Sequence, residues 1–414
     1  MSQQALKKRS VILKNTILYD FQKELLNKIK PNYLIAADTG TGKTIMAIYH
    51  YLRYSKGEPL LVVCPPQKKK EGGWDRDIDL INETHNIDIQ YEIMSYGVLH
   101  KHWKDYKGWF VVFDECHYIK NPTSRRGKAG MNLTKIATHF LLLSATPASN
   151  GWSDTINYFI MFGYYKNKTQ FNKQHAIFSQ IDYGHGPINK VTDYREQDKL
   201  KKLYQSFSIK LKKEDCLDLP PLVTENVHFM PSKEYKIIEK DRVLDDELFD
   251  NISKLQHGLR YHANQKDKLK YTEMLLEGTD ENIIIFYNYK QENEDLKKIV
   301  KKLDKTLFEV SGNSIKLPNK EDWEDLNNSV TLVQYQAGSA GIELQYANVV
   351  IFYTPTYSYQ DYEQALGRAY RNGQTRKVTV YQYQTLKTIE ISIYKALNNK
   401  KDFTEELFRK EINA

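Results

Sequence analysis

Eight short apolar runs, each bounded by turn residues, constrain the fold of this chain more than any other feature. Their residues are apolar on both faces, as in parallel strands that helices cover on both sides, and helical patterns follow the runs. This repeated order predicts an α/β fold with parallel sheets. The predicted strands are Tyr33–Ala36, Leu60–Cys64, Phe110–Phe113 and Phe140–Leu143 in the first half, and Ile283–Tyr287, Thr331–Val333, Val349–Tyr353 and Val378–Tyr381 in the second.

The runs fall into two groups, so we expect the α/β plan to be built twice. A charge cluster that ends in two prolines, Lys210–Pro221, separates the groups, because a regular helix cannot cross it. We predict a first lobe over residues 1–213 and a second lobe over 277–414. Residues 214–276 would form a linker and a helical segment between them.

Composition excludes several classes of protein. No apolar run approaches the roughly 18 residues of a membrane helix, so we expect no membrane partner. The basic N-terminus lacks the apolar core of a secretory signal, which favours a cytoplasmic location. Three widely separated cysteines argue against a disulfide scaffold or a zinc cluster.

Positive charge is concentrated in the first half of the chain. Residues 1–213 contain 33 Lys and Arg against 19 Asp and Glu, whereas residues 214–414 contain 27 against 33. A basic lobe fits a polyanionic partner such as nucleic acid. A solvated lysine-rich surface explains the same counts.

A glycine-rich segment, Ala37–Thr44, stands between a predicted strand and the predicted helix Ile45–Tyr54. Backbone N–H groups of such a loop curl around a phosphate, and the helix N-terminus adds its positive dipole. Lys43 would reach the β- and γ-phosphates, and the Thr44 hydroxyl would bind Mg²⁺. Ala37 replaces the first glycine of the usual pattern, and a chance glycine-rich turn is the alternative. The predicted nucleotide-binding residues are Thr39, Gly40, Thr41, Gly42, Lys43 and Thr44.

Asp114 and Glu115 follow the predicted strand Phe110–Phe113. They suit a second motif of the nucleotide site, an acidic one. Asp114 would hold Mg²⁺, and Glu115 would take a proton from the attacking water. Ser144 and Thr146 end the following strand. Their hydroxyls would bond toward the acidic motif or cap a helix.

Three residues of the second half, Gln364, Arg368 and Arg371, have the spacing of one helix face within and beyond Tyr359–Tyr370. No acidic residue lies between Gly367 and Lys377 to pair with the two guanidiniums. Beside a phosphate loop, such arginines act as fingers on the γ-phosphate. An exposed basic helix face is the alternative.

Taken in order from about Leu18 to Tyr394, these motifs resemble the superfamily-two helicases, and among them the SWI/SNF-type double-stranded DNA translocases. The resemblance implies two RecA-like lobes that flank an ATP cleft, with ATP and Mg²⁺ as cofactors. The compact length is similar to that of motors from bacteriophages, which suggests a bacterial or phage-host cell.

The resemblance also implies further site residues. Gln22 would read adenine, and Gly341 would contact the nucleotide. His117 would join Ser144 and Thr146 in coupling. Nucleic-acid contacts would come from Pro65, Trp74, Ser95, Tyr96, Gly338 and Ser339.

Two departures from the SWI/SNF pattern bear on the activity. Ser144-Ala145-Thr146 is the general helicase form, and Glu343 stands where that branch commonly has Asn. We predict an ATP-dependent translocase on double-stranded DNA. A strand-separating DNA or RNA helicase is the first alternative, and a non-hydrolysing DNA-binding clamp is the second. A small-molecule kinase would leave the arginine motif unexplained.

Overall fold

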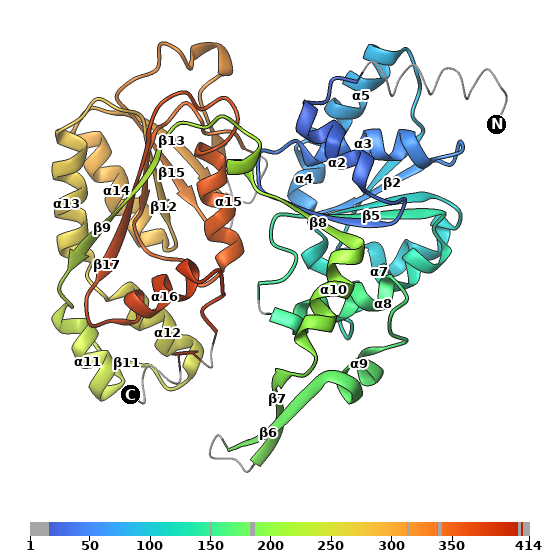
Figure 1. Ribbon diagram of the computed structural model, residues 1–414. Helices are drawn as coiled ribbons and strands as arrows, with labels where there is room; N and C mark the ends of the chain where they lie inside the picture. Colours follow the sequence, from blue (N-terminus) through green and yellow to red (C-terminus); the bar gives the residue numbers. More distant parts are fainter. Residues whose placement is uncertain are drawn as a thin grey trace. The chain divides into compact units, whose positions relative to one another are not determined.

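The computed structural model describes residues 16–149, 151–182, 187–312, 314–335, 337, 342–404 and 407–408. The chain divides into two compact units, Met1–Cys216 (unit 1) and Leu217–Ala414 (unit 2). Each unit contains its own largely parallel sheet with helices packed on it (Figure 1). The α/β fold with parallel-sheet cores that the sequence predicts is confirmed.

Unit 1 is built on a six-stranded sheet in which every neighbouring pair is parallel. In spatial order its strands are β3 (Tyr91–Ser95), β2 (Leu60–Cys64), β4 (Phe110–Asp114), β5 (His139–Ser144), β1 (Tyr33–Ala37) and β8 (Ser208–Leu211). All four strands predicted for this half are present. The two edge strands, β3 and β8, were not predicted, because their partly exposed residues do not form a continuous apolar run.

Alternate residues of the unit 1 strands enter two separate cores. Ile35, Val62 and Val112 pack on one face of the sheet. Leu34, Leu61 and Val111 pack on the other, because successive side chains of a strand point to opposite faces. This two-sided burial is the physical reason for the unbroken apolar runs in the sequence.

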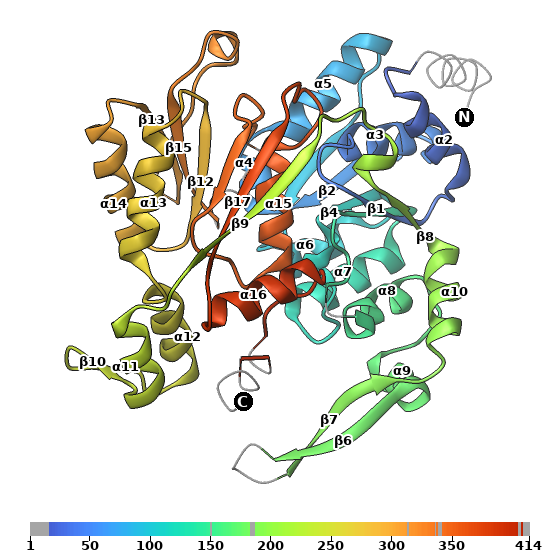
Figure 2. The same ribbon diagram turned by 60° about the vertical axis from the view of Figure 1, so that its left-hand side comes forward.

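The helices of unit 1 cover both faces of this sheet. They are α2 (Asp20–Lys28), α3 (Lys43–Tyr54), α4 (Pro66–Lys70), α5 (Gly73–His85), α6 (Leu99–His102), α7 (Arg125–Ile136), α8 (Ile156–Met161), α9 (Lys168–His175) and α10 (Gln197–Phe207). An antiparallel ribbon of β6 (Ala176–Asp182) and β7 (Pro187–Tyr194) extends away from the rest of the unit (Figure 2).

Unit 2 is built on a seven-stranded sheet, parallel except for its β13–β14 pair. In spatial order its strands are β14 (Ser314–Lys316), β13 (Thr306–Ser311), β15 (Ser329–Gln334), β12 (Ile283–Tyr287), β16 (Val349–Phe352), β17 (Val378–Thr385) and β9 (Leu222–Phe229). The four strands predicted for this half are present. The edge strand β9 lies in the segment that we expected to be linker and helix, and only its last residue, Phe229, is buried.

The helices of unit 2 include three that fall almost entirely within residues 214–276, where a linker and a helical segment were predicted. They are α11 (Lys233–Asp241), α12 (Ile252–Tyr261), α13 (Gln265–Glu277), α14 (Lys290–Lys302), α15 (Tyr359–Ala369) and α16 (Ile389–Asn398). A short ribbon of β10 (Val243–Leu244) and β11 (Glu247–Leu248) follows α11. Among the described residues, none of the helices has both the length and the apolar character needed to cross a bilayer.

Candidate active site

The glycine-rich loop joins the end of β1 to the start of α3, as the sequence predicts. Gly40 and Gly42 have φ angles of 83° and 77°, in the left-handed region that glycine adopts without strain. A Cβ atom on Gly42 would also lie only 2.4 Å from Nε2 of Gln22. The backbone conformation and this close approach therefore both require glycine at position 42.

Gln22 fastens the loop from the neighbouring helix α2. Its Nε2 donates to the Thr41 carbonyl oxygen at 2.9 Å, and its Oε1 accepts from the Tyr19 N–H at 2.9 Å. The side chain is buried. Its adenine-reading role stays a prediction, and the structure adds a second task, holding the shape of the loop.

Lys43 and Thr44 begin helix α3 at the base of the loop. The Lys43 ammonium donates to the carbonyl oxygens of Ala37 at 2.7 Å and Asp38 at 3.0 Å. Burial lowers the pKa of Lys43, although Glu115 nearby opposes that shift. Within the described part of the chain the Thr44 hydroxyl has no hydrogen-bond partner, so its oxygen is available to a ligand.

The two acidic residues lie at the carboxyl end of β4, two strands from β1. Asp114 and Glu115 are both buried, and buried carboxylates require paired charges or hydrogen bonds. Lys68 of α4 supplies the charge, with its Nζ 2.9 Å from Asp114 Oδ2 and 3.3 Å from Glu115 Oε1. The indole Nε1 of Trp74 donates to the same Oδ2 at 3.0 Å.

Glu115 remains ionised in this setting. Burial alone would raise its pKa, but Lys68, the hydrogen bond from His117 and the Lys43 charge together hold the pKa well below its usual range. A carboxylate that is ionised near neutral pH is able to accept a proton from water.

His117 and Ser144 join the acidic pair from the adjacent chain segments. His117 Nδ1 lies 3.1 Å from Ser144 Oγ, and both atoms lie 3.4 Å from Glu115 Oε2. The backbone N–H of Thr146 donates to Ser144 Oγ at 3.1 Å. Of the predicted coupling residues, His117 and Ser144 thus contact Glu115, and Thr146 contacts Ser144.

Three of the predicted nucleic-acid contacts lie in the interior instead. Pro65 and Trp74 are buried. Tyr96 is fully buried, its hydroxyl donates to the Asp114 carbonyl oxygen at 2.9 Å, and its ring stacks on Tyr118 at a centroid distance of 5.2 Å. Burial limits direct contact by these three side chains, and their role in binding nucleic acid stays a prediction. Ser95 is partly exposed.

In unit 2 the predicted arginine motif begins on helix α15. Gln364 and Arg368 lie on the helix, but the helix ends at Ala369, so the predicted shared face does not extend to Arg371. Its own segment contains no acidic residue, but Arg371 has an acidic partner from an earlier part of the chain. Its Nη2 lies 3.5 Å from Oε1 of Glu343, which pairs in addition with Lys320.

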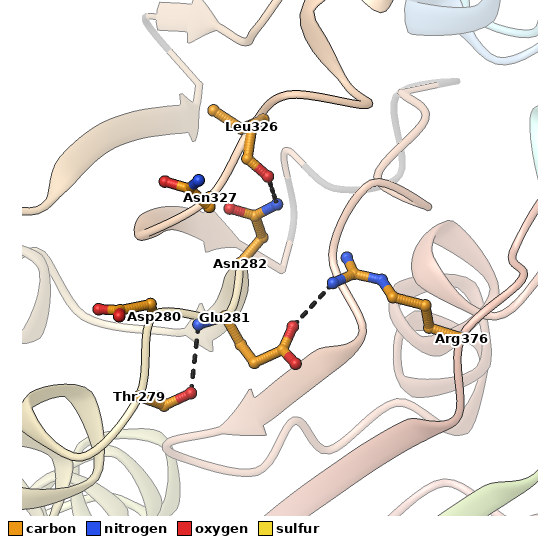
Figure 3. A pocket seen from close by; sticks show the side chains of 7 residues that line it. All are labelled: Thr279, Asp280, Glu281, Asn282, Leu326, Asn327 and Arg376. Carbon is orange, nitrogen blue, oxygen red and sulfur yellow. Dashed lines mark hydrogen bonds and ion pairs between the residues drawn. The ribbon is translucent and has the colours of Figure 1, made fainter.

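The loop after Arg371 is fastened beside the amino ends of the unit 2 strands. Gln374 Nε2 donates to the Ala347 carbonyl oxygen at 2.9 Å, two residues before β16 begins. Arg376 forms an ion pair with Glu281 at 2.7 Å. Both residues line a pocket, which Figure 3 shows from close by. Its volume is about 340 Å³. The pocket is lined by Thr279, Asp280, Glu281, Asn282, Leu326, Asn327 and Arg376.

Gly338, Ser339 and Gly341 lie outside the described residues. No group of three or more His, Cys, Asp or Glu side chains in the described part of the chain is arranged to hold a metal ion. The predicted Mg²⁺ ligands are instead one hydroxyl, Thr44, and one carboxylate, Asp114. Oxygen donors of this kind suit Mg²⁺, which takes its remaining ligands from phosphates and water.

Sequence reasoning missed Lys68 altogether and assigned Trp74 to nucleic acid. Both residues lie in the segment after β2, far along the chain from the acidic pair. The lysine run Lys68–Lys70 gave no signal that one of its members points inward.

Two family models match the chain. The model described as "SNF2-related domain" matches residues 79–240, and the model described as "Helicase conserved C-terminal domain" matches residues 266–373.

Curated relatives match most of this chain. YwqA of Bacillus subtilis (strain 168), which carries the name of an ATP-dependent helicase/translocase, is 23% identical over 91% of this chain and 46% of its own length. The SWI/SNF-related matrix-associated actin-dependent regulator of chromatin subfamily A-like protein 1 of Xenopus tropicalis is 24% identical over 84% of this chain and 40% of its own. The chain therefore spans less than half the length of these relatives.

A solved structure, the Sulfolobus solfataricus SWI2/SNF2 ATPase core in complex with dsDNA, aligns with 95% of this chain and 92% of its own. The two sequences are 21% identical, and the TM-score is 0.43.

Proposed function

Since the chain belongs to the SNF2-type helicases of superfamily two, we propose that it hydrolyses ATP to ADP and phosphate and uses the free energy to move along double-stranded DNA. The observation that carries the proposal is the buried network of unit 1. At the carboxyl ends of three parallel strands, an ionised Glu115 contacts the Ser144–His117 pair and feels the charge of the phosphate-loop lysine, Lys43. Ligands of open α/β sheets bind at that edge.

Each group in the network has a role in hydrolysis. The loop and Lys43 would hold the β- and γ-phosphates, and Glu115 would accept the proton of the attacking water. Thr44 and Asp114 would hold Mg²⁺, which neutralises phosphate charge when it is bound. Arg368 and Arg371 of unit 2 would stabilise the charge that develops on the γ-phosphate, and Gln364 would act with Arg368 from the same helix.

The Ser144 contacts suggest how hydrolysis is coupled to motion. Because Ser144 touches both Glu115 and His117, a change at the γ-phosphate would reach the end of β5 through a single hydroxyl. Backbone tracking by a motor of this kind predicts weak sequence preference and a steep dependence on salt.

Steady-state ATP hydrolysis without nucleic acid, and with duplex DNA, single-stranded DNA or RNA, tests the proposal, with Glu115→Gln as the inactive control. Stimulation by duplex DNA alone supports a translocase. Stimulation by single strands or RNA indicates the strand-separating helicase instead, and a tailed-duplex displacement assay beside a triplex displacement assay separates the two. Hydrolysis no faster than that of the control would leave only the DNA-binding clamp.

A further inference from the structure

Lys68 connects the two acidic residues of unit 1 through a single ammonium group. Its Nζ reaches Oδ2 of Asp114 and Oε1 of Glu115, at 2.9 and 3.3 Å. The other oxygen of Glu115, Oε2, has His117 and Ser144 as its neighbours. Each oxygen of Glu115 therefore faces a donor inside unit 1, and only 6% of the side chain is exposed.

This arrangement limits how water can approach Glu115. A general base must come within about 2.6–3.2 Å of the proton it removes, or act through one water. Ser144 and His117 are buried, so they cover Oε2 from the interior of the unit. Oε1 is covered by Lys68. Access of a water molecule to Oε1 therefore depends on where the Lys68 ammonium lies.

Lys68 is also the member of this cluster that can move at the least cost. Its side chain is 24% exposed, compared with 3% for Asp114, and it comes from the short helix α4. A lysine ammonium is a point charge on a flexible four-carbon chain, so it can exchange one anionic partner for another.

The other contacts of the acidic pair would remain after such an exchange. Asp114 Oδ2 would keep the indole donor of Trp74. Glu115 would keep His117 and the nearby charge of Lys43. Neither buried carboxylate would be left without a donor or an opposite charge, so the displaced arrangement avoids the large cost of an uncompensated buried ion.

We propose that Lys68 is a latch on Glu115, and that a backbone phosphate of bound nucleic acid opens it by taking over the Lys68 ammonium. The inference rests on the proposed function, which supplies the phosphate. Lys68 is then a positioning residue, because it acts on hydrolysis through Glu115 and does not touch the reacting atoms. Nucleic acid raises the rate of hydrolysis by uncovering Oε1 of Glu115.

Lys68→Met in the full chain tests the latch, by steady-state ATP hydrolysis without DNA and with saturating duplex DNA at one salt concentration. The rate without DNA is expected to rise about tenfold, because Oε1 is no longer covered. The rate with saturating DNA should stay within about twofold of wild type, so the stimulation ratio falls about tenfold.

Two further variants serve as controls. Lys69→Met makes the same charge change on the next residue of α4, which is exposed, and should leave the rate without DNA unchanged. Lys68→Arg keeps a cation within reach of both carboxylates and should retain the low rate without DNA. Thermal unfolding of each variant establishes that it is folded, and Lys68→Gln replaces Lys68→Met if that protein does not fold.

Two results would overturn different parts of the argument. If wild type is stimulated by DNA and Lys68→Met shows the same stimulation ratio, the latch is wrong although the proposed function stands. If no nucleic acid stimulates wild type, the proposed function fails. In that case the rate of Lys68→Met without DNA still tests whether Lys68 restrains Glu115. An unchanged or lower rate rejects this restraint, and a higher rate supports it.

Discussion

Unit 1 and unit 2 share a parallel α/β plan, but they present their candidate catalytic residues in different ways. In unit 1 the phosphate loop, the acidic pair and Ser144 all lie at or just after the carboxyl ends of strands. In unit 2 the arginine motif begins on a helix, and its loop is fastened beside the amino ends of strands.

The packing around the two sets differs as well. The acidic residues of unit 1 are buried, and each has more than one partner inside the unit. Arg371 of unit 2 is about a quarter exposed, and its ion pair is with a Glu343 side chain that is 28% exposed. The ends of strands hold the candidate catalytic residues of unit 1 in place, whereas a partly exposed ion pair orients Arg371. We therefore expect unit 1 to determine nucleotide binding and unit 2 to affect mainly the rate.

The largest expected effect separates these two tasks. Arg371→Ala should lower kcat by roughly 10³-fold, because an arginine finger stabilises charge only in the transition state. Affinity for a non-hydrolysable ATP analogue, measured by calorimetric titration, should change by less than about threefold. Lys377→Ala, an exposed change nearby, is the control. Equal losses of affinity and rate would contradict the division of tasks.

The second prediction concerns the most deeply buried charges of unit 2. Lys268 and Glu390 form an ion pair in the core between α13 and α16. Lys268→Met leaves Glu390 buried without its partner and should lower the free energy of unfolding by about 3–5 kcal/mol.

Urea denaturation measures this loss, with Lys298→Met as the matched control. Lys298 pairs with Asp295 on the surface, so its replacement should cost less than about 1 kcal/mol. A similar cost for both variants would show that burial does not distinguish the two pairs.

The third prediction concerns acid sensitivity in unit 1. His50 on α3 is fully buried, its Nε2 donates to the Pro31 carbonyl oxygen, and its Nδ1 has no partner among the described residues. Burial lowers the pKa of His50 to about 4. The unfolded chain therefore binds this proton at a higher pH than the folded chain does. Stability should fall by up to about 3 kcal/mol as the pH drops from about 6.5 to about 4.

Denaturation curves at several pH values check this expectation. His50→Gln removes the titrating group and should flatten the dependence across that window. An equally steep loss of stability in His50→Gln would assign the acid sensitivity to other residues.

The smallest expected effect concerns Glu343. Glu343→Gln removes the carboxylate that orients Arg371 and should lower the rate of ATP hydrolysis by only about two- to threefold, since partly exposed ion pairs contribute about 1 kcal/mol or less. The steady-state assay measures it directly. A hundredfold fall would instead make Glu343 an essential support of Arg371.

Much of the fold could be predicted because its signals are local. All eight apolar runs form strands, and the glycine-rich segment forms the loop between β1 and α3. A strand covered on both faces needs a continuous apolar run, and a tight phosphate loop needs glycine at defined positions. The edge strands β8 and β9 escaped prediction because almost none of their residues is buried, so they contain no such run.

The site was predictable only in part, for a related reason. Glycine, lysine and acidic residues at strand ends mark the phosphate loop and the acidic pair through spacing alone. The partners of the acidic pair carry no such mark. Lys68 and Trp74 are 46 and 40 residues from Asp114 in the sequence, and strand order brings them together.

The sequence by itself thus determined the two α/β units, the phosphate loop and the identity of the acidic pair, because each depends on neighbouring residues or on strand burial. Only the tertiary structure decided that Lys68 and Trp74 face Asp114, that Tyr96 is buried, and that Arg371 has Glu343 as its partner. Such contacts depend on which strands lie side by side and where a helix ends. Strand order and the point where a helix ends follow from the packing of the whole unit. They leave no pattern in any one segment of the chain.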